Sequence, residues 1–249
     1  MRWECGSIQR SRELWVATTA VPNFEPYDSV DVGRTALARF DLDTGERTGW
    51  FEPVRGEAPR WFGDVTIASD GTAFTTDSQG GGLYRISPDA EEIEEWVPSG
   101  TFPSPQGLVL SQDDALLFVA DYARGIATVD TGTGEVSFLA APINTSILGI
   151  DGLYRHGQSL IAIQNGILPH RVIRIGLSDS GRALTSVETL LANHPQFAEP
   201  TLGVVDDDAL IFVANSQWFE FDAAGALPPA TELVPPVILR LDLGRAPGD

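Results

Sequence analysis

The sequence contains no lysine and only one cysteine, Cys5. A single cysteine excludes a disulfide within the chain and says little about the compartment. All 16 basic residues are arginine, and the sequence has 35 acidic residues, so the formal net charge is −19. A surface of this sign repels phosphate backbones, and we therefore expect no nucleic-acid partner.

Long apolar runs are also missing. No stretch approaches the roughly 18 apolar residues that a membrane helix needs, so we expect no membrane partner. The start of the chain, Met1–Cys5, lacks the basic residues and apolar core of a signal peptide. As written, the sequence predicts a soluble cytoplasmic protein, or an exported one if a leader has been lost. Its oligomeric state is left open.

No stretch shows a sustained 3.6-residue period, which predicts almost no helix. Instead, one pattern of a short apolar strand, an acidic turn and a second strand returns along the chain. It is clearest in Leu108–Tyr122, and we find it five times in all. Its other copies lie around Leu14–Ala17, Val65–Ser78, Gly152–Asn165 and Leu202–Ser216.

Each copy continues into a third strand of alternating apolar and polar residues, and usually into a fourth. Turn sequences such as Asp43–Glu46 and Thr131–Glu135 separate them and suit tight hairpins. Four antiparallel strands per unit, at a spacing of about 45–60 residues, are typical of propeller blades. The sequence therefore predicts an all-β chain, a single β-propeller domain over residues 1–249, with five visible blades.

The last predicted blade has no fourth strand, because a polar tail, Gly244–Asp249, follows its third. We expect either that residues near Met1–Glu4 supply the missing strand or that a sixth blade precedes this chain, and we favour the second because four residues make a poor strand. Two connections, Thr19–Thr35 and Gln217–Pro236, are long and rich in proline and aromatic residues. Long loops on a rigid frame are common functional sites, and these two could form one lid; the alternative is that they only cover the surface.

Oxygen-bearing side chains gather at one predicted end of the blades. In a propeller the first strand of each blade lines the axis and the second strand ends at the same mouth. The first strands here begin near Asp64, Gln106, Asp151 and Glu199, and the second strands end at Asp77, Asp121, Asn165 and Asn215. Carboxylate and amide oxygens are the ligands that Ca²⁺ prefers. The three histidines show no ligand spacing, and we expect each to lie in a surface loop.

Between Gly63 and Ser216 the sequence resembles the senescence-marker-protein/gluconolactonase family of six-bladed propellers. The resemblance lies in Gly63-Asp64-Val65-Thr66, Pro105-Gln106-Gly107-Leu108 and Asp151-Gly152-Leu153. Paraoxonases and strictosidine-synthase-like proteins are more distant relatives. The resemblance implies a lactonase with a divalent cation, Ca²⁺ before Mg²⁺, Mn²⁺ or Zn²⁺, held by a Glu, an Asn and an Asp.

Carried over position by position, the resemblance makes Asp151 a metal ligand and the general acid/base. Gln106 stands where the family has a ligand Asn, and its longer side chain would require either the cation to shift or the backbone to retreat. Glu199 before Pro200 is a loose match to the ligand Glu. Gly63 stands where the family has an Asn on the substrate side. Glycine offers no side chain there, but the neighbouring Asp64 could supply one. These departures make the resemblance in site weaker than that in fold.

Further substrate contacts are expected from polar and aromatic side chains at the same mouth, namely Asp121, Asn165, Tyr27 and Trp218. Each position has a local alternative. Asp151-Gly152 and Gln106-Gly107 could be tight bends at the start of a strand, and Asp121 could bond only the backbone of its own turn.

Two functions of different classes follow. The first is metal-dependent hydrolysis of a lactone or related small ester as small-molecule substrate, in the mouth of the central channel. The second is a non-catalytic propeller that binds a small ligand or a protein partner through the aromatic loops around Tyr27 and Trp218. The absence of a Gly-x-Ser-x-Gly motif argues against a serine hydrolase.

Overall fold

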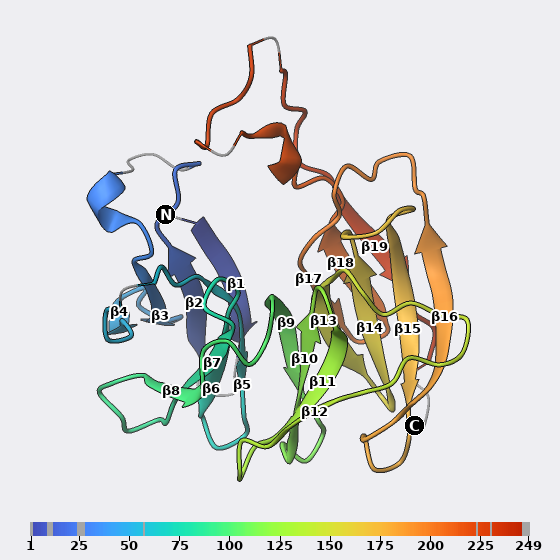
Figure 1. Cartoon of the computed structure of the whole chain (residues 1–249), viewed down its shortest axis with the longest axis horizontal. Helices are drawn as coiled ribbons and strands as arrows, with labels where there is room; N and C mark the ends of the chain where they lie inside the picture. Colours follow the sequence, from blue (N-terminus) through green and yellow to red (C-terminus); the bar gives the residue numbers. More distant parts are fainter. Residues whose placement is uncertain are drawn as a thin grey trace. The chain divides into compact units, whose positions relative to one another are not determined.

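Antiparallel strands make up almost all regular structure of the chain (Figure 1). The computed structural model describes residues 2–8, as backbone only, and residues 12–23, 28–56, 58–222, 224–229 and 231–245. The strands in chain order are β1 (Arg2–Ile8), β2 (Glu13–Thr19), β3 (Thr35–Asp41), β4 (Arg47–Phe51), β5 (Phe62–Ile67), β6 (Ala73–Asp77), β7 (Gly82–Ile86), β8 (Glu94–Val97), β9 (Pro105–Leu110), β10 (Leu116–Asp121), β11 (Gly125–Asp130), β12 (Val136–Phe138), β13 (Ile150–His156), β14 (Ser159–Gln164), β15 (Arg171–Leu177), β16 (Leu184–Ala192), β17 (Gly203–Asp206), β18 (Ala209–Val213) and β19 (Ile238–Asp242).

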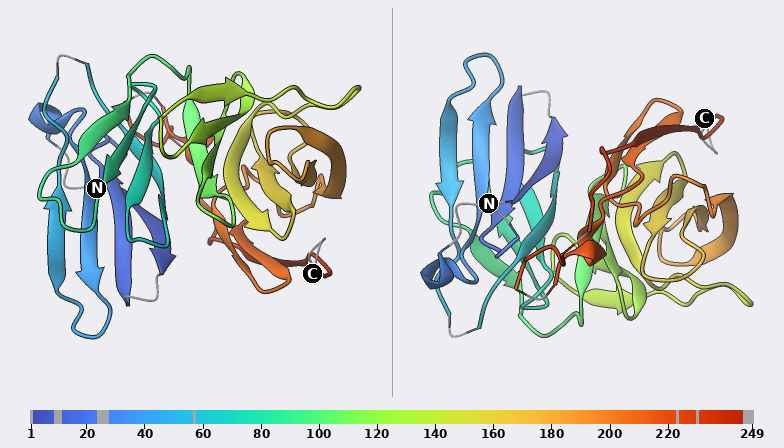
Figure 2. Two further views of the ribbon diagram at one scale, coloured as in Figure 1. Left: turned by 90° about the horizontal axis from the view of Figure 1, so that it is seen from below. Right: turned by 90° about the horizontal axis from the view of Figure 1, so that it is seen from above.

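These strands form five antiparallel sheets in which each strand pairs with the next one along the chain. Four sheets have four strands, β1–β4, β5–β8, β9–β12 and β13–β16, and the fifth has three, β17–β19. In both views of Figure 2 the strands of the first sheet lie side by side as such a meander. The predicted fold class, an all-β propeller of antiparallel blades with almost no helix, is confirmed.

By its internal contacts the chain divides into two compact units. The first unit is Met1–Leu108 with Ala223–Ala226, and the second is Val109–Asp222 with Leu227–Asp249. Each unit has a core of its own, because one face of every sheet is apolar and must be buried. Trp15 stacks on Phe51 with ring centroids 5.6 Å apart in the first core, and Phe118 packs with Ile150 and Leu160 in the second.

The first blade uses the start of the chain as its own first strand. β1 pairs with β2, with Arg2 opposite Thr19 and Cys5 opposite Val16. Residues Arg2–Glu4 therefore do not supply the missing strand of the last blade, and β19 has no partner on its outer side among the described residues. The prediction of a three-stranded last blade is confirmed, whereas the suggestion that Met1–Glu4 completes it is wrong.

The two long connections contain the two helical turns of the described chain. The 3₁₀ turn η1 (Ser29–Asp31) lies in the first and η2 (Trp218–Glu220) in the second. At its tip the second connection lies against the first: a Cβ on Gly225 would collide with the backbone of Pro22 and Asn23. No helical segment in the described part of the chain has the length or apolar character to cross a bilayer.

Candidate functional site

Four chain segments of the second unit bring polar side chains to one edge of its sheets. Tyr122 and Asn165 directly follow β10 and β14, whereas Asp151 opens β13 and Glu199 precedes β17. In an antiparallel sheet the end of one strand lies beside the start of its neighbour, so these positions share an edge. We call Tyr122, Asp151, Asn165, Glu199 and their hydrogen-bond donors the acidic cluster.

A β-bulge presents Asp151 at this edge. The pairing of β13 with β14 shifts between Ile150 and Leu153, so that Asp151 and Gly152 interrupt the regular ladder. The same shift occurs in β5 between Phe62 and Val65, at Gly63 and Asp64. A bulge bends the strand and re-aims the side chain that it carries.

One oxygen of Asp151 is held by two hydrogen bonds. Its Oδ2 accepts from the Asn165 Nδ2 at 2.8 Å and from the Thr201 hydroxyl at 2.6 Å. Its other oxygen, Oδ1, accepts no hydrogen bond from the described residues. The carboxylate is therefore fixed in orientation while one oxygen stays available for a water, a substrate or a cation.

Asn165 connects Asp151 to Tyr122. Asn165 is buried, and its Oδ1 accepts a hydrogen bond from the Tyr122 hydroxyl. This orientation of the amide follows from Asp151, because an ionised carboxylate only accepts hydrogen bonds and so requires the NH₂ group on its side. Tyr122, Asn165 and Asp151 thus form one directed chain of hydrogen bonds.

Glu199 lies in the left-handed region of the backbone, at a φ of 63°, with only 8% of its surface exposed. Ser216 stabilises this conformation, because its N–H donates to the Glu199 carbonyl at 3.1 Å and its hydroxyl donates at 3.0 Å. The Glu199 Oε2 accepts from the backbone N–H of Phe219 at 3.1 Å. Hydrogen bonds from the loop Ser216–Phe219 thus hold both the backbone and the side chain of Glu199.

The charges of the cluster act on one another. Burial, first of all, raises the pKa of Glu199, and the negative charge of Asp151 adds to the rise, against hydrogen bonds from Phe219, Ser216 and Trp218 that lower it. Burial and the charges of Asp151 and Glu199 also raise the pKa of Tyr122. Tyr122 therefore remains a protonated hydrogen-bond donor. The carboxyl groups of Asp151 and Glu199 lie close enough for their charges to repel.

Gly63, Asp64 and Gln106 belong to the first unit and meet around Thr76. The Thr76 hydroxyl donates to the Gln106 carbonyl at 2.9 Å, and a Cβ on Gly63 would lie 3.1 Å from the same hydroxyl. The Asp64 carboxylate accepts from the N–H groups of Val65 and Leu108 at 2.8 and 3.3 Å. The Gln106 amide donates to the Ser104 hydroxyl at 3.0 Å. Their proposed roles toward a metal or substrate stay predictions.

Asp121 has the contacts of a turn residue. Its carboxylate is fully buried, and Oδ1 accepts from the N–H groups of Ala123 and Arg124 at 3.0 and 2.8 Å. Asp77 holds the corresponding turn after β6, where Oδ1 accepts from Gly80 at 2.8 Å. These are the bonds that the local alternative predicts, and contact of Asp121 with a substrate stays a prediction.

The expectation of a surface loop is wrong for His156. This residue ends β13 with 4% exposure, because the strand continues to its pairing with Ser159, and its Nε2 lies 3.0 Å from Asp208 Oδ1.

Of the two aromatic residues expected at the mouth, only one is described. Trp218 begins η2 half-buried, with its ring centroid 6.5 Å from that of Phe221, and the next residue, Phe219, is 71% exposed. Tyr27 lies outside the described residues.

Sequence reasoning missed three members of the cluster, Tyr122, Thr201 and Ser216. Tyr122 directly follows the Asp that ends β10, the position at which Asn165 follows β14, so the alignment of the repeats could have identified it. Thr201 and Ser216 gave no such signal, because they act through contacts with residues 50 and 17 positions away.

The acidic cluster offers the type of ligand atom, oxygen, that a hard cation prefers. All its free acceptors are oxygens, and two carboxylates that repel each other would be relieved by a positive charge between them. Asp151 and Glu199 are the residues that would hold the ion, with water and substrate supplying further ligands. Among the described residues no group of three or more His, Cys, Asp or Glu side chains is arranged as a metal site. Gln106, the other predicted ligand, lies in the first unit.

Comparison with solved structures shows the fold. A catalytically inactive virginiamycin B lyase from Staphylococcus aureus, solved with quinupristin, matches 84% of this chain with a TM-score of 0.57 and 19% identity. A nidogen/laminin complex matches 84% with a TM-score of 0.59 and 15% identity, covering 70% of that chain. A gluconolactonase from Xanthomonas campestris matches 76% with a TM-score of 0.50 and 17% identity, covering 67% of that chain.

The chain spans 64% of the length of the lyase that it matches. No protein-family model matches the sequence, and no curated protein matches it significantly. At these identities the neighbours share a fold with this chain, and the fold alone does not fix a function.

Proposed function

We propose that the protein hydrolyses a lactone or a related small ester at the acidic cluster. The observation that carries this proposal is the fixed orientation of Asp151, which is held through one oxygen by Asn165 and Thr201 and leaves the other free. Gluconolactonase-like neighbours of the same fold support the substrate class. The resemblance of Asp151-Gly152-Leu153 to the lactonase family points to the same residue.

Hydrolysis of an ester needs one group that takes a proton from water and later returns it. The free Asp151 oxygen can accept the proton of a water whose oxygen bonds to the ester carbonyl carbon. The ring C–O bond then breaks, and Asp151 returns the proton to the leaving alkoxide, which gives a hydroxy acid. General acid–base catalysis of this kind is worth about 10²–10⁴ in rate.

Tyr122 and Asn165 are positioning residues in this scheme. The Tyr122 hydroxyl fixes the Asn165 amide, and the amide fixes the Asp151 carboxylate. Because burial and the neighbouring charges raise the pKa of Tyr122, its hydroxyl keeps the proton that it donates to Asn165. Glu199, whose pKa is also raised, limits the negative charge beside Asp151 when it carries a proton.

We also propose a divalent cation, Ca²⁺ before Mg²⁺, Mn²⁺ or Zn²⁺, held by Asp151 and Glu199. A bound cation of this type polarises an ester carbonyl and lowers the pKa of a coordinated water. Because ligands must be deprotonated, a proton on Glu199 would compete with the ion, and metal affinity should rise with pH.

The test is the hydrolysis of a panel of sugar and aliphatic lactones by the wild-type chain and two matched variants. Asp151→Asn keeps the shape and removes the base, so we expect kcat to fall by about a hundredfold or more. Asp179→Asn makes the same change at an exposed turn and should leave kcat unchanged. Each assay is run with added metal and after chelation. Absence of any lactonase activity, or equal activity of Asp151→Asn, would refute the proposal.

A second candidate function is binding without catalysis through the loop Ser216–Glu220. The exposed Phe219 beside the half-buried Trp218 favours it, as does the occurrence of the same fold in the nidogen/laminin complex. It predicts that Trp218→Ala abolishes binding of a small ligand or protein partner while Asp151→Asn does not. Loss of lactone hydrolysis in Asp151→Asn would decide against it.

A further inference from the structure

Exposed apolar side chains of the second unit gather at the edge that carries the acidic cluster. Among the described residues of this unit, every large apolar side chain that is exposed lies in a connection at that edge or at the start of β19, with the exception of Val204 on β17. The described hairpins at the opposite end contain none of them and expose acids instead, such as Asp113, Asp179 and Asp207. A one-sided distribution of this kind indicates a contact surface, because exposed apolar side chains are otherwise scattered singly.

The connection before β13 and the connection after β14 are joined to the acidic cluster through their backbones. The N–H of Gly149 donates to the Tyr122 carbonyl at 2.8 Å, and the Gly149 carbonyl accepts from the N–H groups of Asn165 and Gly166, both at 3.1 Å. A Cβ on Gly166 would lie 2.5 Å from the Tyr122 ring, so the ring rests against this backbone. Both connections are thus fixed beside Tyr122 and Asn165.

Leu148 and Leu168 are the exposed apolar residues of these two fixed backbones. Leu148 precedes Gly149 and is 42% exposed, whereas Leu168 follows Gly166 by two positions and is 83% exposed. The Gln164 side-chain amide donates to the Leu148 carbonyl at 2.7 Å and so holds this backbone from the end of β14. Contact with an apolar group would remove the surface of both leucines from water, which is favourable.

Phe219 is the corresponding apolar residue on the Glu199 side of the cluster. It is 71% exposed, although its N–H donates to Glu199 Oε2 at 3.1 Å. The start of this turn is held by Gln217, whose side-chain amide donates to the Val234 carbonyl and accepts from the Val234 N–H, both at 2.9 Å. Hydrogen bonds therefore fix a loop that leaves an aromatic ring in solvent. We call Leu148, Leu168 and Phe219 the apolar rim.

We infer that the substrate of the acidic cluster carries an apolar substituent, such as an alkyl chain, and that the apolar rim binds it. This inference rests on the proposed lactone hydrolysis and narrows its substrate class to lactones with an apolar substituent, before polyhydroxylated sugar lactones. Asn165 bonds to Asp151 and stands three positions before Leu168. Three residues span at most about 11 Å, a distance that a lactone ring with a chain of about six carbons can cover.

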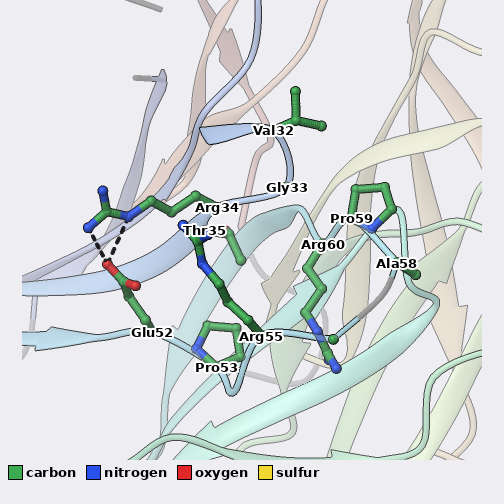
Figure 3. A pocket seen from close by; sticks show the side chains of 11 residues that line it. Val32, Gly33, Arg34, Thr35, Glu52, Pro53, Arg55, Ala58, Pro59 and Arg60 are labelled. Carbon is green, nitrogen blue, oxygen red and sulfur yellow. Dashed lines mark hydrogen bonds and ion pairs between the residues drawn. The ribbon is translucent and has the colours of Figure 1, made fainter. Parts of the chain in front are cut away.

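The cavity of the first unit is of a different kind (Figure 3). It measures about 190 Å³, and its lining includes Arg34, Arg55, Arg60 and Glu52. Arg34 Nε and Nη2 donate to Glu52 Oε1 at 3.1 and 2.9 Å. An alkyl chain placed there would displace water from charged groups, which costs free energy. We therefore expect the apolar substituent at the apolar rim rather than in this cavity.

The test compares γ-lactones that differ only in an alkyl chain, from none to hexyl, as substrates of the full chain. In the wild type, kcat/KM should rise about two- to fourfold for each methylene group that the rim withdraws from water. Leu168→Ala and Phe219→Ala remove rim surface. In each, the ratio of kcat/KM for the hexyl lactone to that for the unsubstituted lactone should fall about fivefold or more. The ratio is taken within one variant, so a general loss of active protein does not change it.

Leu42→Ala is the matched control, because it removes the same side chain from an exposed position after β3 in the first unit and should leave the ratio unchanged. Binding of the corresponding γ-lactams, which resist hydrolysis, is measured by isothermal titration calorimetry. If no lactone is hydrolysed, the proposed function fails, whereas lactam binding that tightens with chain length and weakens in Leu168→Ala would still support the apolar rim as a binding site. Equal kcat/KM and equal lactam binding for the unsubstituted and hexyl rings, or an unchanged ratio in Leu168→Ala, would overturn the inference.

Discussion

Glu199 combines an unusual backbone conformation with a buried acid. Its φ is 63°, its carboxyl group is largely withdrawn from water, and its pKa is raised by burial and by the charge of Asp151. A carboxyl group with a raised pKa binds its proton more tightly in the folded chain than in the unfolded one. Its contribution to stability is therefore complete at pH values below its unfolded pKa and is lost as the pH rises through the folded value.

Glu199→Gln removes this titration, since glutamine is neutral at every pH. We expect the variant to melt at a higher temperature than the wild type at pH 7.5 and the difference to shrink toward pH 4. Thermal melts followed by circular dichroism across this range measure it. Glu92→Gln, at an exposed position, should leave the melting temperature unchanged. A Glu199→Gln variant that is less stable than the wild type at pH 7.5 would contradict the expectation.

Sequence reasoning identified the acceptors of the acidic cluster better than its donors. Asp151, Asn165 and Glu199 stand at strand starts and ends, positions that the repeat assigns to one edge. The donor Thr201 holds Asp151 from 50 residues away, just before a strand of another sheet, so this contact depends on how neighbouring sheets pack.

At the scale of the element, an aspartate ends the second strand of two successive sheets. Asp77 ends β6 and Asp121 ends β10, and both are fully buried. Each accepts hydrogen bonds from backbone N–H groups two and three residues ahead, which fixes the turn into the third strand. In the next sheet the second strand, β14, ends at Gln164, and the residue after it, Asn165, takes part in the acidic cluster instead.

Asp121→Ala leaves these turn amides without their acceptor and should lower the free energy of unfolding by about 1–3 kcal/mol. Asp121→Asn keeps an acceptor oxygen at the same place and should cost less. Urea unfolding of the two variants beside the wild type measures the difference. If alanine and asparagine have the same effect, the hydrogen bonds to Ala123 and Arg124 are not what the carboxylate contributes.

The strands themselves could be predicted because alternation of apolar and polar residues is a local signal. The repeat predicted consecutive antiparallel strands, and every sheet of the structure is built from them. β18 ends at Val213, two residues before the predicted end at Asn215. The side chain of Asn215, in place of its backbone, bonds the backbone of the facing segment: it donates to Pro235 O at 3.0 Å and accepts from Val237 N–H at 2.6 Å. A side chain that replaces a ladder bond leaves no periodic trace.

At the scale of the whole molecule, net charge opposes compactness. A charge of −19 on 249 residues repels itself, and dissolved salt screens this repulsion over about 10 Å at 0.1 M. Most ion pairs among the described residues have at least one exposed partner and contribute little, so the same salt removes little stabilisation.

The melting temperature should therefore rise with salt at pH 7.5, by roughly 2–4 °C for each kcal/mol of repulsion that is screened. Scanning calorimetry in sodium chloride from low to high concentration measures the slope. The same series near the isoelectric point, about pH 4.3, is the control, because the net charge is close to zero there. A melting temperature that falls with salt at pH 7.5 would show that the ion pairs outweigh the repulsion.

The last sheet ends on β19, whose outer backbone groups have no partner among the described residues. Protection from hydrogen–deuterium exchange should therefore alternate along this strand. Amides that face β18 exchange slowly, whereas those on the opposite side exchange as in a peptide. Exchange rates along Ile238–Asp242 would thus report whether another strand, from a longer chain or a second molecule, covers that side in solution.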